Sequence, residues 1–199
     1  MFLTRKEIEK LIKKGKIDIK IEEVTEYGSL YKKLSIRDKL KYVTDHGIEL
    51  TISRYYYKIK SDLNKEVIDL EHDWSREIYV FCDGFTDIVI PPKSFIIMTT
   101  VEYISLPEDV AGICCLRSTC ARWGLIIPPT IVDAGFEGVL AIELFNANDY
   151  TVKIPVGAKM ICLALFKTKG KNMYKGFYRG QSKLQVLPKN LKNFNVYSD

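Results

Sequence analysis

From Gly47 onward the sequence is a succession of short apolar or alternating runs separated by Gly, Pro, Asp and Asn. Runs of this length between turn residues predict β-strands. They do not alternate with helical segments, and neither G-x-G-x-x-G nor G-x-x-x-x-G-K-[ST] occurs, which argues against dinucleotide-binding and P-loop architectures. The sequence therefore predicts a mainly β fold, a sandwich or a barrel. The expected strands are IELTISRYYYKI (48–59), EVIDL (66–70), EIYVFC (77–82), TDIVI (86–90), SFIIMTTVEYI (94–104), VAGICCL (110–116), VLAIELFN (139–146), TVKI (151–154) and KMICLALFK (159–167).

The chain before Gly47 has a different character. Residues 4–15 predict a helix, because Thr4 and Glu7 have the spacing of a capping box and Gly15 suits a helix C-cap. The run KIDIKIEE then alternates as a strand does. Residues 21–46 are polar, charged and aperiodic, which indicates a loop-rich insertion with room for a short helix around residues 36–42.

The length of the chain suits one domain over residues 1–199. Its expected parts are an N-terminal helix and strand (1–20), the loop-rich insertion (21–46), a β core (47–167) and a C-terminal tail (168–199). The tail is rich in Gly, Lys and aromatic residues, and we expect it to be mobile.

Charge and cysteine content narrow the possible partners. The 30 basic and 25 acidic residues interleave, so no block of charge indicates nucleic-acid binding, whereas a small anionic ligand suits the net charge of +5. No apolar run of about 18 residues is present and the first residues are too charged for a secretory signal, so we expect no membrane span and a cytoplasmic protein. Five cysteines in apolar runs and two histidines favour neither a disulfide framework nor a zinc site.

Glu143 is the only charged residue of the run VLAIELFN. Strand alternation places Glu143 and Ala141 on one face and Ile142 and Leu144 on the other. A buried carboxylate is costly unless it is paired or protonated. The functional interpretation is a general base in a pocket whose apolar surroundings raise its pKa. The alternative is a surface glutamate or a structural ion pair.

The stretch CLRSTCARWG (115–124) places two arginines around two hydroxyl groups. Guanidinium groups match phosphate oxygens, and hydroxyls and the backbone N–H groups of a turn add further donors. The alternative is a pair of arginines that bridge loops. Asp133 in IVDAGFEG precedes Ala-Gly, a turn signal, and taken alone it indicates a turn former.

The order of these segments carries more information than any one of them. The run LRSTCARWGL…IVDAGFEGVLAIELFN resembles the signature of the dCTP deaminase/dUTPase superfamily, in which R-S-S-x-A-R-x-G-L precedes I-D-x-G-[FWY]-x-G and a strand that ends L-E-[FL]-[YF]-N. Thr119 replaces the second serine and keeps the hydroxyl. The segments VEYISLPEDVAG, GIELTISRYYYKI, IPVGAKMICLALF and YKGFYRGQSKL also resemble family segments. The resemblance covers residues 1–20 and 47–187.

The resemblance implies a dUTPase-type β-clip fold, a β-sandwich or jelly-roll-like subunit with an N-terminal helix. It implies a homotrimer with sites between subunits, a dCTP or dUTP ligand that carries Mg²⁺ on its triphosphate, and neither nucleic acid nor membrane as partner. Glu143, Arg122 and Ser118 would be catalytic. The implied nucleotide-binding residues are Arg117, Ser118, Thr119, Cys120, Ala121, Arg122, Asp133, Ala141, Ile142, Glu143, Tyr174 and Gln181.

Glu143 favours deamination of dCTP, because family deaminases have Glu here and family dUTPases tend to have an apolar residue. Deamination needs a proton shuttle beside C4 of cytosine. The H-x-E…P-C-x-x-C signature of zinc deaminases is absent, which agrees with a zinc-free route. The segment LIIPPTIVD lacks the histidine of the deaminases, and Phe177 stands where they have lysine. Hydrolysis of dUTP with Asp133 as base, alone or with deamination, therefore stays open, as does a binding module without turnover.

Overall fold

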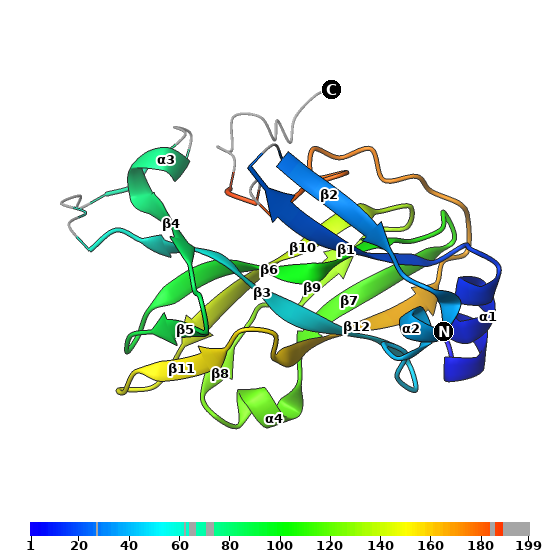
Figure 1. Cartoon of the computed structure of the whole chain (residues 1–199), viewed down its shortest axis with the longest axis horizontal. Helices are drawn as coiled ribbons and strands as arrows, with labels where there is room; N and C mark the ends of the chain where they lie inside the picture. The colour runs from blue at the N-terminus through cyan, green and yellow to red at the C-terminus, as the bar shows by residue number, and fades with distance from the viewer. Residues whose placement is uncertain (27, 62, 64–66, 71–73, 184–185, 189–199) are drawn as a thin grey trace.

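The computed structural model describes residues 1–26, 28–61, 63, 67–70, 74–183 and 186–188. Antiparallel β-sheet dominates it, and one helix lies at its N-terminal end (Figure 1), which confirms the predicted mainly β class. The elements are α1 (Arg5–Lys13), β1 (Asp18–Thr25), β2 (Gly28–Lys33), α2 (Ile36–Leu40), β3 (Gly47–Ile59), α3 (Ser75–Ile78), β4 (Tyr79–Asp83), β5 (Asp87–Ile90), β6 (Phe95–Ser105), β7 (Val110–Leu116), α4 (Ser118–Ala121), β8 (Leu125–Ile126), β9 (Thr130–Val132), β10 (Glu137–Asn146), β11 (Val152–Pro155) and β12 (Lys159–Lys167).

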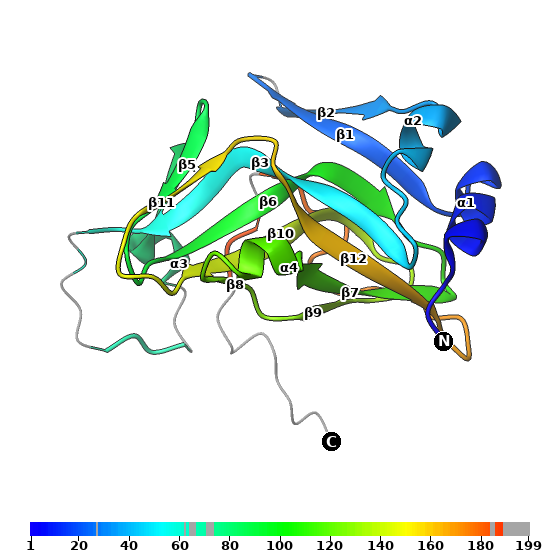
Figure 2. The same cartoon turned by 90° about the horizontal axis from the view of Figure 1, so that it is seen from below.

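The long strand β3 connects two layers of sheet. Its first residues pair with β12, and its second half pairs with β6 and β4. On one side β12 continues through β7 to β9, and on the other side β6 pairs with β1 and β10. The sheet therefore folds over itself, as the views in Figures 1 and 2 show, and encloses a core between its layers.

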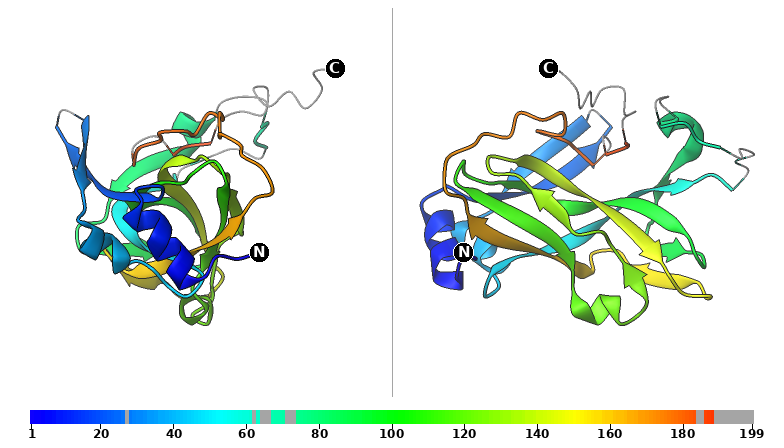
Figure 3. Two further views of the ribbon diagram at one scale, coloured as in Figure 1. Left: turned by 90° about the vertical axis from the view of Figure 1, so that its right-hand side faces the viewer. Right: turned by 180° about the vertical axis from the view of Figure 1, so that it is seen from behind.

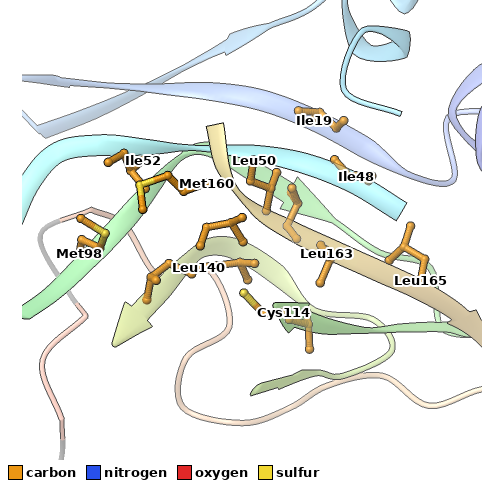
Figure 4. Close-up of a cluster of buried hydrophobic side chains, with 14 of the residues drawn as sticks. Ile19, Ile48, Leu50, Ile52, Met98, Cys114, Leu140, Met160, Leu163 and Leu165 are labelled. Carbon is orange, nitrogen blue, oxygen red and sulfur yellow. The ribbon is translucent and has the colours of Figure 1, made fainter. Parts of the chain in front are cut away.

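Aliphatic side chains of several strands fill this core. Ile48, Leu50 and Ile52 alternate along β3 and are fully buried, and Leu163 and Leu165 meet them from β12 (Figure 4). Strand alternation sends these residues to the inside while Glu49 and Thr51 point the other way. The side-chain period of two thus decides which residues of β3 remain available for polar contacts.

A second, smaller apolar cluster lies on the other face of β6 and β10. It contains Tyr57, Ile97, Tyr103, Val139 and Val186. Val139 stands opposite Tyr103 in the register, and Ala141 stands opposite Thr99, with an irregularity between these pairs. At this irregularity the Thr100 hydroxyl accepts from the Leu140 N–H at 3.0 Å and donates to the Glu102 carbonyl at 2.8 Å, which replaces ladder bonds and fixes the register of β10.

Two expectations for the chain are wrong. Residues 21–46 are not loop-rich, because β1 continues to Thr25 and pairs with β2 as a hairpin, although the short helix expected there is present as α2. The strand expected over 66–70 is absent from its described part, residues 67–70. The expected mobility of the tail stays a prediction. Residues 189–199 lie outside the described part, and Asn172, Tyr174 and Gly180 make main-chain hydrogen bonds to the body of the protein.

Candidate active site

Strand β10 presents Glu143 as the sequence predicts. Leu140, Ile142 and Leu144 are at most 5% exposed and face the core, whereas Glu143 lies on the opposite face beside Ile97 of β6. Alternation thus commits the carboxyl group to the face that also carries the second apolar cluster. It also means that Ile142, which the family resemblance places at the nucleotide, has its side chain in the core.

A cavity of about 340 Å³ lies beside Glu143. Small-molecule sites begin at roughly 300 Å³, so its size suits a ligand of nucleoside class. Five of the implied nucleotide-binding residues line it: Asp133, Ala141, Glu143, Tyr174 and Gln181. The remaining wall is mostly apolar and aromatic and includes Tyr79, Phe95, Cys114 and Phe136, none of which the sequence singles out.

Burial in this wall raises the pKa of the Glu143 carboxyl above its ordinary value, the direction that the sequence predicts. The same effect raises the pKa of the Cys114 thiol to about 12, so this thiol stays protonated near neutral pH and is no nucleophile. Burial also raises the pKa of Tyr79, and the negative charge of Glu143 raises it further, so the Tyr79 hydroxyl remains a hydrogen-bond donor. Among these three groups, the carboxyl is the one suited to accept and return a proton.

The chain after β12, here called the closing segment, contributes Tyr174 and Gln181 to the cavity wall. The Tyr174 N–H donates to the Ala134 carbonyl at 3.0 Å, and the Tyr174 ring lies 5.7 Å from that of Phe136 between centroids. Gln181 donates from Nε2 to the Val139 carbonyl at 2.7 Å. Its Oε1 is buried and has no hydrogen-bond partner among the residues that the structure describes. A buried amide oxygen without a partner is costly, which makes it an acceptor for a ligand.

The arginine-rich turn lies elsewhere. Arg117 is the N-cap of the short helix α4, which lies well apart from the closing segment in Figure 1. The side chains of Arg117, Ser118, Thr119, Ala121 and Arg122 are exposed, and none lines the Glu143 cavity.

Cys120, the remaining implied residue of this turn, lines a different cavity, of about 360 Å³, together with Trp123 and Met160. Within one chain the structure therefore brings together the residues expected to contact the base and the sugar of the nucleotide. The residues expected to contact its phosphates lie apart from them.

Alternation along β7 explains this separation. Cys114 reaches the Glu143 cavity from one face, so Arg117, three residues later, points to the other face. On that face Cys115, Cys162 and Glu49 are cross-strand neighbours on β7, β12 and β3.

Glu49 holds Arg117 on this second face. Its Oε1 lies 2.6 Å from Arg117 Nη1, and its Oε2 lies 3.5 Å from Lys159 Nζ. Arg117 Nη1 also donates to the Lys159 carbonyl at 3.4 Å. The Nε and Nη2 groups of Arg117 have no protein partner within the described ranges, so one edge of the guanidinium stays open for an anion. No sequence signal distinguishes Glu49 from an ordinary solvent-facing glutamate of an alternating strand.

Two further findings bear on the expected partners. Among the described residues, no group of three or more His, Cys, Asp or Glu side chains is placed to hold a metal ion. Nor does any helix in the described part of the chain have the length and apolar character needed to cross a membrane.

A mostly apolar cavity around the half-buried Glu143 carboxyl, on an antiparallel β fold, is typical of β enzymes and binding modules for small ligands. A family model described as dCTP deaminase-like matches residues 2–168, so the chain belongs to that family. The dCTP deaminase of Pyrobaculum calidifontis is 36% identical over 96% of this chain and 98% of its own length. That of Caldivirga maquilingensis is 37% identical over 96% of this chain and 98% of its own.

The dCTP deaminase of Pyrobaculum aerophilum is 50% identical, but the match spans 54% of this chain and 60% of that protein. A solved 2'-deoxycytidine 5'-triphosphate deaminase from Agrobacterium tumefaciens covers 82% of this chain and 46% of its own, with a TM-score of 0.57 and 14% identity. At that identity the likeness shows the fold alone, and it agrees with the predicted β-clip class.

Proposed function

We propose that this protein deaminates dCTP to dUTP with release of ammonia. The observation that carries the proposal is the partly buried Glu143 carboxyl in a ligand-sized cavity with Asp133, Tyr174 and Gln181. Ionised Glu143 would take a proton from water, and the hydroxide would add to C4 of cytosine. The carboxyl would then give this proton to N3, take the proton of the new C4 hydroxyl as the carbonyl forms, and pass it to the departing amino group, so that the C4–N bond breaks, one water is consumed and one ammonia leaves. The relatives named dCTP deaminase support this substrate.

The triphosphate would be held by the α4 turn. Arg117, Ser118, Thr119 and Arg122 supply guanidinium and hydroxyl donors, with Cys120 and Ala121 contributing backbone, and the open edge of Arg117 suits a phosphate. Ser118 and Arg122 would also orient the attacking water. Mg²⁺ would arrive bound to the triphosphate, as part of the substrate.

The turn and the cavity lie on opposite faces of β7, which supports a site completed by a second copy of the chain. We propose a homotrimer in which the cavity of one subunit meets the α4 turn of its neighbour. A sedimentation mass of one subunit at micromolar protein would contradict it. If Arg117 and Glu143 of one site come from different chains, then mixing Arg117→Ala with Glu143→Gln subunits should restore activity that neither variant has alone. No recovery in demonstrably mixed trimers would place both residues in one chain. The cytoplasmic location stays a prediction.

A second candidate, cleavage of dUTP to dUMP and pyrophosphate, is favoured by one observation. The exposed Asp133 carboxyl lines the same cavity and has access to solvent water. The test is to incubate the protein with Mg²⁺ and dCTP or dUTP in turn, and to assay ammonia and pyrophosphate separately. Ammonia from dCTP supports the proposal, both products support a bifunctional enzyme, and pyrophosphate from dUTP alone would replace it with the second candidate.

A further inference from the structure

Residues 180–183, here called the docking segment, attach at two separate places. The first is the start of β10. The Gly180 N–H donates to the Glu137 carbonyl at 2.6 Å, and Gln181 exchanges bonds with Val139, accepting from its N–H at 3.1 Å and donating from Nε2 to its carbonyl at 2.7 Å. Gly138 permits this close approach, since a Cβ there would lie 3.2 Å from the Gln181 backbone nitrogen.

The second place is β1, where Glu22 holds both ends of Lys183. The Lys183 backbone N–H donates to Glu22 Oε2 at 3.0 Å, and the Lys183 ammonium donates to the Glu22 carbonyl oxygen. Lys183 is 4% exposed and Glu22 is 1% exposed. Burial lowers the pKa of Lys183, and the nearby carboxylates of Glu22, Glu102 and Glu23 oppose that shift. Buried charged groups persist when they are hydrogen-bonded and lie near opposite charge, as these two do.

The two attachments lie on different strands of one sheet. β10 pairs with β6, and β6 pairs with β1, so the docking segment crosses the face that carries Tyr103 and Val139. Val186 packs in that same apolar cluster. Figure 3 shows the chain after β12 passing over β10 toward the β1–β2 hairpin. This hairpin is part of the segment that the family signature does not cover.

Gln181 lies between the two attachments and lines the Glu143 cavity. Its Nε2 is fixed on Val139, so its Oε1 has little freedom, and this buried oxygen lacks a partner within the described residues. A buried acceptor without a donor destabilises the ligand-free protein, and a hydrogen bond from a ligand removes that penalty. Because the side chain is already fixed, binding requires no further loss of its conformational entropy.

We propose that Glu22 and Lys183 are positioning residues: their buried contact holds Gln181 in the cavity wall, where its amide oxygen accepts a hydrogen bond from the bound substrate. The identity of that substrate rests on the proposed function, whereas the contact itself does not. The proposal gives the β1–β2 hairpin a role in catalysis, as the anchor of the segment that completes the cavity.

Loss of the anchor should act through the fraction of molecules in which the segment is docked. Apparent affinity falls in proportion to that fraction. If Lys183→Met lowers the docked fraction to about one tenth, KM for dCTP rises about tenfold. Once nucleotide is bound it supplies the missing contacts, so kcat should stay within about threefold of wild type. Glu23→Gln is the matched control, because it removes a neighbouring exposed carboxylate that also interacts with Lys183 but makes no bond to it.

The experiment measures kcat and KM for dCTP, and amide hydrogen exchange, in wild type, Lys183→Met and Glu23→Gln. We expect a raised KM and faster exchange at residues 180–183 in Lys183→Met, unchanged exchange in β7 and β12, and wild-type behaviour of Glu23→Gln. Unchanged KM and unchanged exchange at residues 180–183 would overturn the proposal.

Lys183→Met removes a buried positive charge near the Glu22 carboxylate and the bond from its ammonium to the Glu22 carbonyl, and the variant can unfold the chain. The double variant Glu22→Gln/Lys183→Met has no charge at either position and should fold. If exchange rises throughout β7 and β12 in the single variant while the double variant has wild-type KM, the contact is purely structural and the proposal fails. Faster exchange confined to residues 180–183 with a raised KM in the double variant supports it.

A double-mutant cycle with Gln181→Ala tests the route of action. If Glu22 and Lys183 act through Gln181, Lys183→Met should raise KM little further in the Gln181→Ala background. A full additional effect would refute positioning of Gln181. Should wild type release no ammonia from dCTP, the proposed function fails. Hydrogen exchange at residues 180–183 would then still report whether Lys183 holds the docking segment. Binding of deoxycytidine to wild type and to Gln181→Ala would report whether Gln181 contributes to the cavity.

Discussion

Replacing Glu143 by glutamine tests the assignment of the general base most directly. Glu143→Gln replaces one carboxyl oxygen by an NH2 group and leaves the size of the side chain and its place opposite Ile97 unchanged. The amide can accept a hydrogen bond but cannot take a proton from water. Since burial already disfavours the ionised carboxyl, a neutral amide should fit the cavity at no cost to folding.

The expected loss follows from what the carboxyl does in the proposed reaction. General acid–base catalysis contributes about 10²- to 10⁴-fold, and each factor of ten is about 1.36 kcal/mol of activation free energy. Glu143 would act in more than one proton transfer, so ammonia release from dCTP should fall at least about 100-fold, or about 2.7 kcal/mol. Binding of dCTP should change little, because the lost interaction belongs to the transition state.

The assay follows ammonia from dCTP at saturating substrate, with calorimetric binding of dCTP and thermal unfolding as controls for occupancy and folding. Any cleavage of dUTP should fall much less, because its base would be Asp133 in the same cavity. Ammonia release at the wild-type rate from Glu143→Gln would refute the reasoning. A variant that fails to bind dCTP would instead assign Glu143 to substrate binding.

Three other outcomes follow from the structure. Because burial raises the pKa of Glu143, kcat/KM for dCTP should rise with pH through that raised pKa as the base form appears. Glu143 also keeps its proton to higher pH in the folded protein than in the unfolded chain, so the free energy of unfolding should fall as pH rises from the ordinary carboxyl pKa through the raised one. Thermal melts of Glu143→Gln across pH should lack that slope. Arg117→Ala should weaken binding of dCTP by roughly 1.5–3 kcal/mol, as measured by calorimetry, and leave binding of deoxycytidine unchanged; equal losses for both ligands would place Arg117 away from the phosphates. Glu49→Ala should also weaken dCTP binding by freeing Arg117, whereas Glu49→Gln should largely restore it by keeping an acceptor at 2.6 Å; if both variants tighten binding, Glu49 acts through its charge alone.

The β core is predictable because its strands are buried on one face or on both. The bounds expected for β7 and β12, residues 110–116 and 159–167, are those observed, since each strand coincides with a nearly continuous apolar run. The orientation of Glu143 is predictable for the same reason, because a period of two leaves it only one face.

The β1–β2 hairpin is not predictable by these means. Among the described strands β2 pairs with β1 alone, at the edge of the sheet, and its residues Leu30 and Tyr31 are 61% and 40% exposed. A strand without a buried face carries no apolar alternation, and its composition then resembles that of a loop. The contact between Glu22 and Lys183 joins residues far apart in the sequence, so no local sequence pattern predicts it.

The division of the candidate site between two faces follows from the same alternation. Cys114 and Arg117 belong to one strand and its continuation, but the odd number of steps between them sends their side chains to opposite sides of the sheet. A β-sheet with a packed core is impermeable to a nucleotide, so a ligand in the Glu143 cavity cannot reach the arginine of its own chain through it. The proposed homotrimer would bring the exposed donors of the α4 turn together with the Glu143 cavity, whose described lining holds no arginine or lysine. In that arrangement the contiguous sequence motif would serve two sites at once, one on each face of the strand that carries it.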